Sequence, residues 1–226
     1  MGQGSDHGSP GRPDSAACRK WLCRVGYLTK VSIYILLALV CLAFAYGWLE
    51  SRKSKAALMD MSRTHEGPLA PQPESLLRGR AIELLRLLPP LQSLHGNGLR
   101  LIAMPSFVEK EYGVVLYRNY GSQAEGVLVV VDRLKPNTSV RSHRFVLSAE
   151  EYSHLTNEMD RLTDGWPGSS VMWLDGVPVA FERVRDARIT SGMGNGEHYG
   201  SLWWLVYGTI RPNVPDEFFP VEVGWR

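Results

Sequence analysis

Apolar and polar positions divide the chain into one uninterrupted apolar stretch near the N-terminus and a long patterned region after it. Residues 31–49 carry no charged side chain. As an α-helix they would span roughly 28 Å, close to the hydrocarbon thickness of a bilayer. Tyrosine and tryptophan stand toward both ends, where amphipathic rings prefer the membrane interface. The pattern predicts a single transmembrane helix over 31–49, which makes the membrane the first expected partner.

A cleavable signal peptide is the alternative interpretation of this stretch. Ala43-Phe44-Ala45 matches the small-x-small pattern that precedes a cleavage site. An apolar run that continues to Leu49, and a charged tail of 30 residues in front of it, are both long for a signal peptide. We therefore expect an uncleaved signal-anchor, with cleavage after Ala45 as the competing possibility.

The two flanks of the apolar stretch differ in composition. Residues 1–30 begin with a Gly-, Ser- and Pro-rich run and contain five basic and two acidic side chains, which predicts a disordered basic tail. Residues 50–73 are charged and end in three closely spaced prolines, which predicts an extended, stiff linker. The folded domain is then expected over 74–226.

Basic residues lie on both sides of the apolar stretch, so proximity alone does not orient it. The positive-inside rule weighs short loops, because long domains cross the membrane largely regardless of charge. The short side is the positive tail. We expect the N-terminus in the cytoplasm and the C-terminal domain outside, in a bacterial inner membrane.

Periodicity within 74–226 predicts a mixture of helices and antiparallel strands. A helix is expected over 74–88, with Arg78, Arg80 and Arg86 outward; its inward face consists of Leu77, Ala81, Leu84, Leu85 and Leu88. Ser148 and Glu151 form a capping-box pattern that opens a second helix, which ends at Gly165. Four short apolar segments between these helices predict an antiparallel meander, over residues 99–104, 112–118, 126–132 and 140–147.

The last third of the chain predicts a hairpin and a buried strand. Asp175-Gly176 suits a type I′ turn between 171–174 and 177–184, and Pro178 indicates an edge strand. Glycines after Ile189 predict a mobile loop that leads into a buried strand over 202–207. The expected fold is therefore α+β, with a meander sheet and two packed helices.

Charge and cysteine content exclude several classes of function. From Val31 onward the chain has 20 basic and 21 acidic residues, without the positive surface on which nucleic-acid binding depends. All three cysteines precede Glu50, so the domain has no disulfide or thiol chemistry. We predict no nucleic-acid partner.

Known cofactor and metal patterns are incomplete in this chain. Gly192, Gly194 and Gly196 lack the further glycine of a dinucleotide loop, because Glu197 stands in its place. Glu151-x-x-His154 could place two ligands on one helical face, but metal sites of that type need several such helices. No cofactor and no metal site is predicted.

Two classes of function follow from the remaining residues. The preferred one is a non-catalytic domain that binds a protein or glycan through Trp203 and Trp204, because neighbouring side chains on a strand face opposite ways and one of them must be exposed. The alternative is a membrane-tethered hydrolase, with His198 as base and Asp175 or Glu182 beside it in a pocket under the glycine loop.

Overall fold

The structure is a computed structural model, and it describes residues 15–72, 75–94, 96–106, 108–118, 123–133, 140–171 and 176–219. The chain divides into two compact units, Met1–Lys53 and Ser54–Arg226, which are treated separately. The first unit contains most of helix α1 (Ser15–Ser62). From Ser32 this helix is long and apolar enough to cross a membrane by length and composition, a property that signal sequences share.

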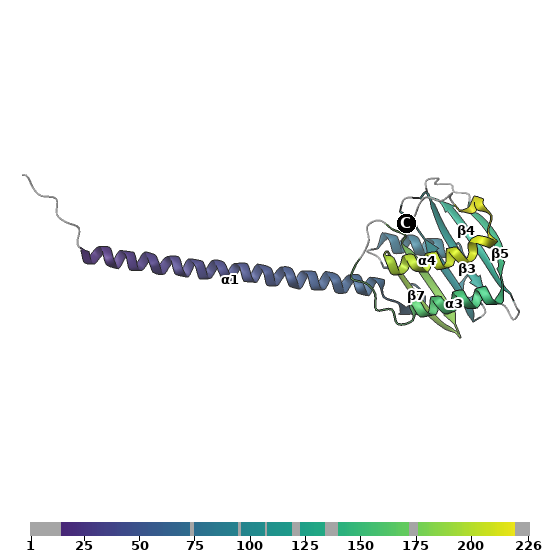
Figure 1. The fold of residues 1–226 in the computed structure, drawn as a ribbon, viewed down its shortest axis with the longest axis horizontal. Helices are drawn as coiled ribbons and strands as arrows, with labels where there is room; N and C mark the ends of the chain where they lie inside the picture. The colour runs from purple at the N-terminus through teal and green to yellow at the C-terminus, as the bar shows by residue number, and fades with distance from the viewer. Residues whose placement is uncertain are drawn as a thin grey trace, which may run out of the picture. The chain divides into compact units, whose positions relative to one another are not determined.

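The second unit is built on an antiparallel sheet, and seven of its strands lie in the described residues (Figure 1). Their order is β1-β7-β6-β2-β3-β4-β5. The four predicted meander strands are confirmed as β2 to β5, and β5 lies at the edge as expected. The strands are β1 (His65–Glu66), β2 (Asn97–Ala103), β3 (Lys110–Tyr117), β4 (Ala124–Asp132), β5 (Arg141–Leu147), β6 (Val179–Arg185) and β7 (Arg188–Gly194).

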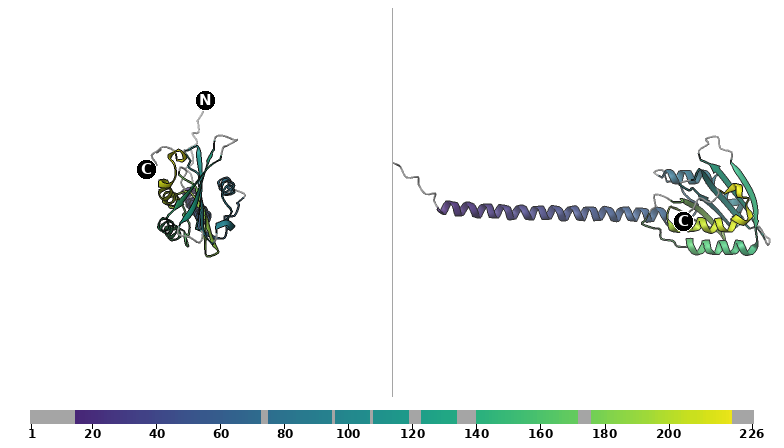
Figure 2. Two further views of the ribbon diagram at one scale, coloured as in Figure 1. Left: turned by 90° about the vertical axis from the view of Figure 1, so that its right-hand side faces the viewer. Right: turned by 45° about the horizontal axis from the view of Figure 1, so that its top comes forward.

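Helices cover both faces of this sheet, which confirms the predicted α+β class (Figure 2). On one face lie α3 (Ala149–Thr163) and α4 (Glu197–Ile210). On the other lie α2 (Leu76–Leu85) and the short 3-10 helix η1 (Leu91–Leu94). Two further 3-10 turns, η2 (Arg211–Asn213) and η3 (Asp216–Phe218), follow α4. Side chains alternate between the faces along every strand, so the sheet has a hydrophobic core on each side.

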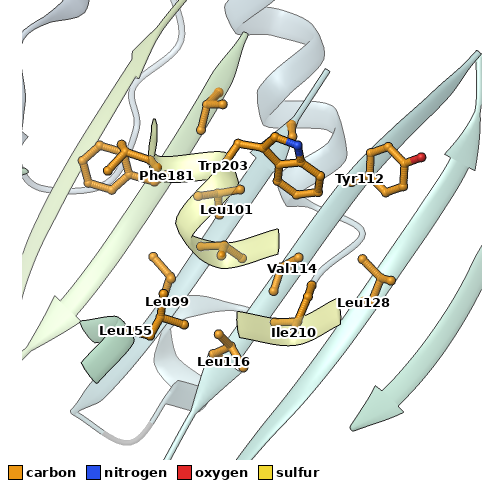
Figure 3. Packing of buried hydrophobic residues seen from close by; sticks show 14 of the residues in the cluster. Leu99, Leu101, Tyr112, Val114, Leu116, Leu128, Leu155, Phe181, Trp203 and Ile210 are labelled. Carbon is orange, nitrogen blue, oxygen red and sulfur yellow. The ribbon is translucent and has the colours of Figure 1, made fainter. Parts of the chain in front are cut away.

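The larger core lies between the sheet and the helices α3 and α4 (Figure 3). The predicted capping box opens α3, and both of its reciprocal hydrogen bonds between Ser148 and Glu151 are present. Behind it Tyr152, Leu155 and Met159 are buried. The smaller core under α2 contains Ala81, Leu84, Leu85 and Leu88, as predicted for the first helix, whereas Leu77, also predicted inward, is 49% exposed.

Segment 50–73 differs from the expected extended linker. Residues 50–62 continue helix α1, and β1 pairs with β7 through His65↔Ser191 and Glu66↔Thr190. Leu69 is buried in the core under α2. Because these positions gain burial and sheet hydrogen bonds, the segment from Ser54 belongs to the folded unit. The predicted disordered tail over 1–30 is also shorter than expected, because α1 already begins at Ser15. Residues 1–14 lie outside the described residues.

Strand β6 corrects the predicted edge hairpin. It lies between β7 and β2, inside the sheet, and residues 172–175 of the predicted hairpin lie outside the described residues. Pro178 precedes the strand, so its missing amide removes no ladder hydrogen bond. The two-residue turn with positive φ is instead at Asp186-Ala187, between β6 and β7, with φ of 49° and 65°.

The prediction of a buried strand over 202–207 is wrong, because these residues belong to helix α4. The prediction of a mobile loop after Ile189 is also wrong, because residues 189–194 belong to strand β7. The buried side chains of α4 recur at the helical spacing of three and four residues: Tyr199, Leu202, Trp203, Val206 and Ile210. A six-residue window is too short to show that period. Gly192 and Gly194 in β7 serve this packing, because a Cβ atom at either position would collide with the Tyr199 side chain.

Candidate functional site

His198 lies in a cavity of about 490 Å³ at the first turn of α4. The cavity is bounded by the last residue of α1, by segment 166–171 after α3, and by Asn195 and Gly196 before α4. Besides His198, the polar residues that line it are Ser62, Ser169, Asn195, Glu197, Tyr199 and Ser201. The structure therefore places His198 at a cavity beside Asn195 and Gly196.

The His198 ring is held by Trp166 and by a backbone carbonyl. The two rings are stacked with centroids 3.6 Å apart and planes 6° apart. The imidazole hydrogen-bonds the carbonyl of Leu162, while its Nε2 is buried and has no partner among the described residues. Burial lowers the pKa of His198 below its ordinary value, because it disfavours the charged form. Burial therefore favours the neutral imidazole.

Glu182 does not join His198, because the two residues lie on opposite faces of the sheet. Glu182 shares the face of Ala180 under α2, whereas α4 packs on the face of Phe181. The Glu182 carboxylate pairs with Arg100 at 3.2 Å and accepts the backbone N–H of Leu69 at 3.0 Å. Asp175, the other candidate acid, lies outside the described residues.

The hydroxyl groups around the cavity are engaged by backbone atoms. Ser62 Oγ donates to the carbonyl of Ser169 at 3.2 Å and accepts the N–H of Ser169 at 2.8 Å. Ser201 Oγ donates to the carbonyl of Glu197 at 2.9 Å. Within the described residues no hydroxyl or carboxylate side chain is hydrogen-bonded to His198. The described residues thus show no contact between a nucleophile and a base of the kind a serine hydrolase has.

The end of α1 is bound tightly beside this cavity. Tyr199 Oη donates to the carbonyl of Ser62 at 2.6 Å, and the N–H of Thr64 donates to the carbonyl of Trp166 at 3.1 Å. Gly168 has φ of +88° and passes so close to the carbonyl of Met59 that no side chain would fit there. These contacts fix the last turn of α1 against the segment that carries Trp166.

A second, smaller cavity of about 60 Å³ adjoins the first and shares Ser62, Ser169, Val171 and Asn195 with it. Its remaining wall is mostly apolar, from Leu58, Met61, Leu77, Pro178 and Met193. Arg78 is the only charged residue among the described lining residues. The helical period predicts Arg78 on the outer face of its helix, but the Arg78 side chain is buried, at 5% exposure.

Trp203 and Trp204 are separated by helical geometry, not by a strand. Trp203 is buried against Tyr112, with ring centroids 5.3 Å apart. Trp204 is 41% exposed and meets the edge of Tyr207 at 5.5 Å. Only Trp204 is thus available to a partner.

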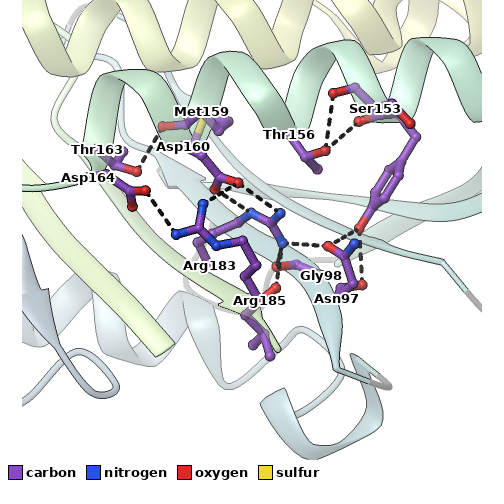
Figure 4. Close-up of polar contacts among 12 residues, drawn as sticks. Asn97, Gly98, Ser153, Thr156, Met159, Asp160, Thr163, Asp164, Arg183 and Arg185 are labelled. Atoms are coloured by element: carbon purple, nitrogen blue, oxygen red, sulfur yellow. Dashed lines mark hydrogen bonds and ion pairs between the residues drawn. The ribbon is translucent and has the colours of Figure 1, made fainter. Parts of the chain in front are cut away.

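Polar residues that sequence reasoning missed hold α3 to the sheet (Figure 4). Arg183 pairs with Asp160 at 2.9 Å and donates to Asn97 Oδ1 at 2.6 Å. Arg185 pairs with Asp160 and Asp164, each at 2.9 Å. All carboxylates of this network are already paired with arginines, so it is a structural network.

Comparisons with known proteins give no relative. No protein-family model matches the chain, and neither a curated protein nor a solved structure matches it. Within the described residues, no group of three or more His, Cys, Asp or Glu side chains could hold a metal ion. The functional argument therefore depends on the chain's own surfaces and cavities.

Proposed function

We propose that this protein is a single-pass membrane protein whose C-terminal α+β domain lies outside the cytoplasm and binds a protein or glycan partner without catalysing a reaction. The exposed aromatic face of α4 is the observation that carries the binding function. The apolar stretch of α1, whose side chains from Ser32 to Leu49 are all exposed, supports the membrane anchor.

The outer face of α4 carries one charge, Glu197 in its first turn, and none after it. No charged residue occurs from Tyr199 to Ile210, and Trp204 stands on the exposed side with Ser201 and Gly208 one turn away in either direction. The outer face of α3, by contrast, is charged and includes Glu150, Glu151 and Arg161. Large aromatic rings contribute much contact area at low entropic cost, and tryptophan is enriched among the residues that dominate binding energy.

The environment of His198 supports a non-catalytic function. A general base needs a proton to remove, from a hydroxyl or a water held within hydrogen-bond reach. The hydroxyls of Ser62, Ser201 and Tyr199 donate to backbone carbonyls instead, and that of Ser169 accepts the N–H of Val171.

Membrane topology is tested with C-terminal reporters that are active only outside or only inside the membrane. We expect a full-length, membrane-bound product with the external reporter active, because the short basic tail stays in the cytoplasm. A shorter soluble product would show cleavage after Ala45, and an active internal reporter would reverse the orientation.

The binding face is tested by placing a photo-crosslinking amino acid at position 204 in the full chain in its native membrane, with position 157 on the exposed face of α3 as the matched control. We expect a discrete adduct at position 204 only. Digestion of the adduct with protease or with glycosidase then identifies a protein or a glycan. Equal labelling at both positions would contradict a binding face on α4.

A further inference from the structure

Arg78 is a buried cation without a carboxylate partner in the described part of the chain. Three arginines of the domain are almost fully buried, with exposures of 5% for Arg78, 8% for Arg100 and 4% for Arg183. Arg100 pairs with Glu182 and Arg183 with Asp160. Arg78 instead donates to two backbone carbonyls, of Met61 at 3.2 Å and of Ala70 at 3.4 Å.

These two carbonyls do not neutralise the guanidinium. A buried charge is costly unless it is paired with an opposite charge, and arginine does not escape that cost by losing its proton under ordinary conditions. The carbonyl of Met61 belongs to the C-terminal turn of α1 and contributes only the partial negative charge of a helix end. Asp60 acts on Arg78 through charge, but its carboxylate is paired with Arg63 at 3.0 Å and is 59% exposed.

The cavity beside Arg78 has the size and lining for a short aliphatic group. Its volume of about 60 Å³ corresponds to room for roughly four water-sized groups. Met61, Leu77 and Met193 contribute apolar side chains to its wall. A ligand that fits must therefore combine one negative charge, placed at the guanidinium, with a few carbon atoms placed against these side chains.

We propose that this cavity binds an aliphatic carboxylate, a short- or medium-chain fatty acid, with its carboxylate on Arg78 and its first carbon atoms against the apolar wall. The planar guanidinium matches a carboxylate in two parallel hydrogen bonds. Burial of the first methylene groups against Met61, Leu77 and Met193 adds a hydrophobic contribution. This site is distinct from the Trp204 face, and its occupancy does not depend on the binding function proposed for that face.

The full chain in lipid nanodiscs is titrated with octanoate that is labelled with ¹³C at its carboxyl carbon, with empty nanodiscs as the reference. We expect a second carboxyl resonance that saturates at one octanoate per protein. 1-Octanol has the chain without the charge and should not displace octanoate at equal concentration, whereas acetate has the charge but fewer carbon atoms and should displace it only at higher concentration. Absence of a saturable resonance, or equal displacement by 1-octanol, would overturn the proposal.

Substitutions then assign the site to Arg78. We expect Arg78→Met to weaken octanoate binding by at least about tenfold, because a charge-assisted hydrogen bond contributes about 1.5–3 kcal/mol. Arg86→Met is the matched control, since Arg86 is exposed on the C-terminal side of the same helix. Near-ultraviolet circular dichroism reports whether each variant is folded. If Arg78→Met does not fold, the comparison of octanoate with 1-octanol on the wild-type chain still tests whether binding requires the carboxylate.

If Arg78→Met is folded and binds octanoate as the wild type does, the carboxylate does not lie on this guanidinium and the proposal fails. Loss of binding in Arg86→Met to the same extent would also overturn it, because the effect would then be one of general surface charge.

Discussion

Each face of the sheet carries a buried ion pair. On the α2 face Arg100 donates to the carbonyl of Leu85 and pairs with Glu182, and on the other face Arg183 reaches Asp160 (Figure 4). Each of these strand residues is buried because its neighbours across the sheet and the helix above it leave no route to water. Burying such a pair removes both charges from water, which costs free energy. The net stabilisation by the pair is therefore much smaller than the destabilisation caused by removing one partner.

Removal of the Glu182 carboxylate should therefore destabilise the domain strongly. Glu182→Leu leaves Arg100 without its counter-ion and the N–H of Leu69 without its acceptor. We expect a loss of about 3–5 kcal/mol in the free energy of unfolding, measured with urea. Glu158→Leu removes only an exposed pair with Arg161 and should change stability by less than about 1 kcal/mol. Similar losses in both variants would contradict a buried pair.

His198 should make stability depend on pH near neutrality. Its pKa is lowered in the folded state, so the unfolded state binds the proton more readily. The contribution of His198 to the free energy of unfolding is therefore complete above the pKa of about 6.5 in the unfolded chain, and it decreases as the pH falls below that value. We expect the unfolding midpoint to decrease as the pH is lowered from about 7.5 to about 5.

His198→Phe is the control for this dependence, because a phenyl ring keeps a flat face for Trp166 but cannot titrate. The variant should show a smaller fall over the same pH range. The carboxylates with a lowered pKa, Glu151 and Glu158, titrate below this range and do not contribute to it. An unchanged slope would show that His198 is not the group responsible.

At the scale of elements, local signals were read correctly where they are contained within a few residues. The capping box of α3 and the period-two strands of the meander needed only neighbours along the chain, and they appear where predicted. The turn between β6 and β7 was missed because Asp186-Ala187 lacks the glycine that marks such turns. Both residues have positive φ, which L-residues other than asparagine and aspartate rarely adopt.

This turn supplies a stabilising substitution. Ala187→Gly removes the steric cost of a Cβ atom at φ of 65°. We expect the free energy of unfolding to increase by up to about 1 kcal/mol, since the steric cost is only partly offset by the greater freedom of glycine in the unfolded chain. Asp186→Gly should gain less, because aspartate tolerates this conformation. A destabilised Ala187→Gly in thermal unfolding would contradict the assigned turn.

At the scale of the whole molecule, the folded unit begins before the prolines and not after them. Ser54 is its first residue by the division into compact units. The last turn of α1, strand β1 and Leu69 add contacts with segments more than 100 residues away in the sequence, through Ser169, Ser191 and Glu182. The segment after the membrane stretch is therefore part of the domain's structure.

Truncation tests this boundary. A fragment of residues 54–226 retains β1, Leu69 and both carbonyl partners of Arg78, whereas a fragment of residues 74–226 loses them all. We expect the shorter fragment to unfold at a clearly lower temperature, because its sheet edge and the core under α2 become open to water. If circular dichroism gives equal unfolding temperatures for the two fragments, the folded unit begins near Glu74 instead.

Part of the candidate site could be found from the sequence and part could not. His198 was singled out by its place beside the glycines, and one of Trp203 and Trp204 was expected to be exposed. Trp166 and Arg78 carried no local signal, because their roles depend on α4 and on the end of α1, respectively.

By itself, the sequence determined the apolar α1 stretch, the meander, the capped helix and the α+β class, because each depends on the spacing of side chains within a few turns or strands. Tertiary structure alone decided the position of β6 inside the sheet, the helical state of 202–207, and the burial of Arg78 and Glu182. These features depend on contacts between segments distant in the chain, and the free energy of burial there outweighs the local preferences on which sequence patterns rest.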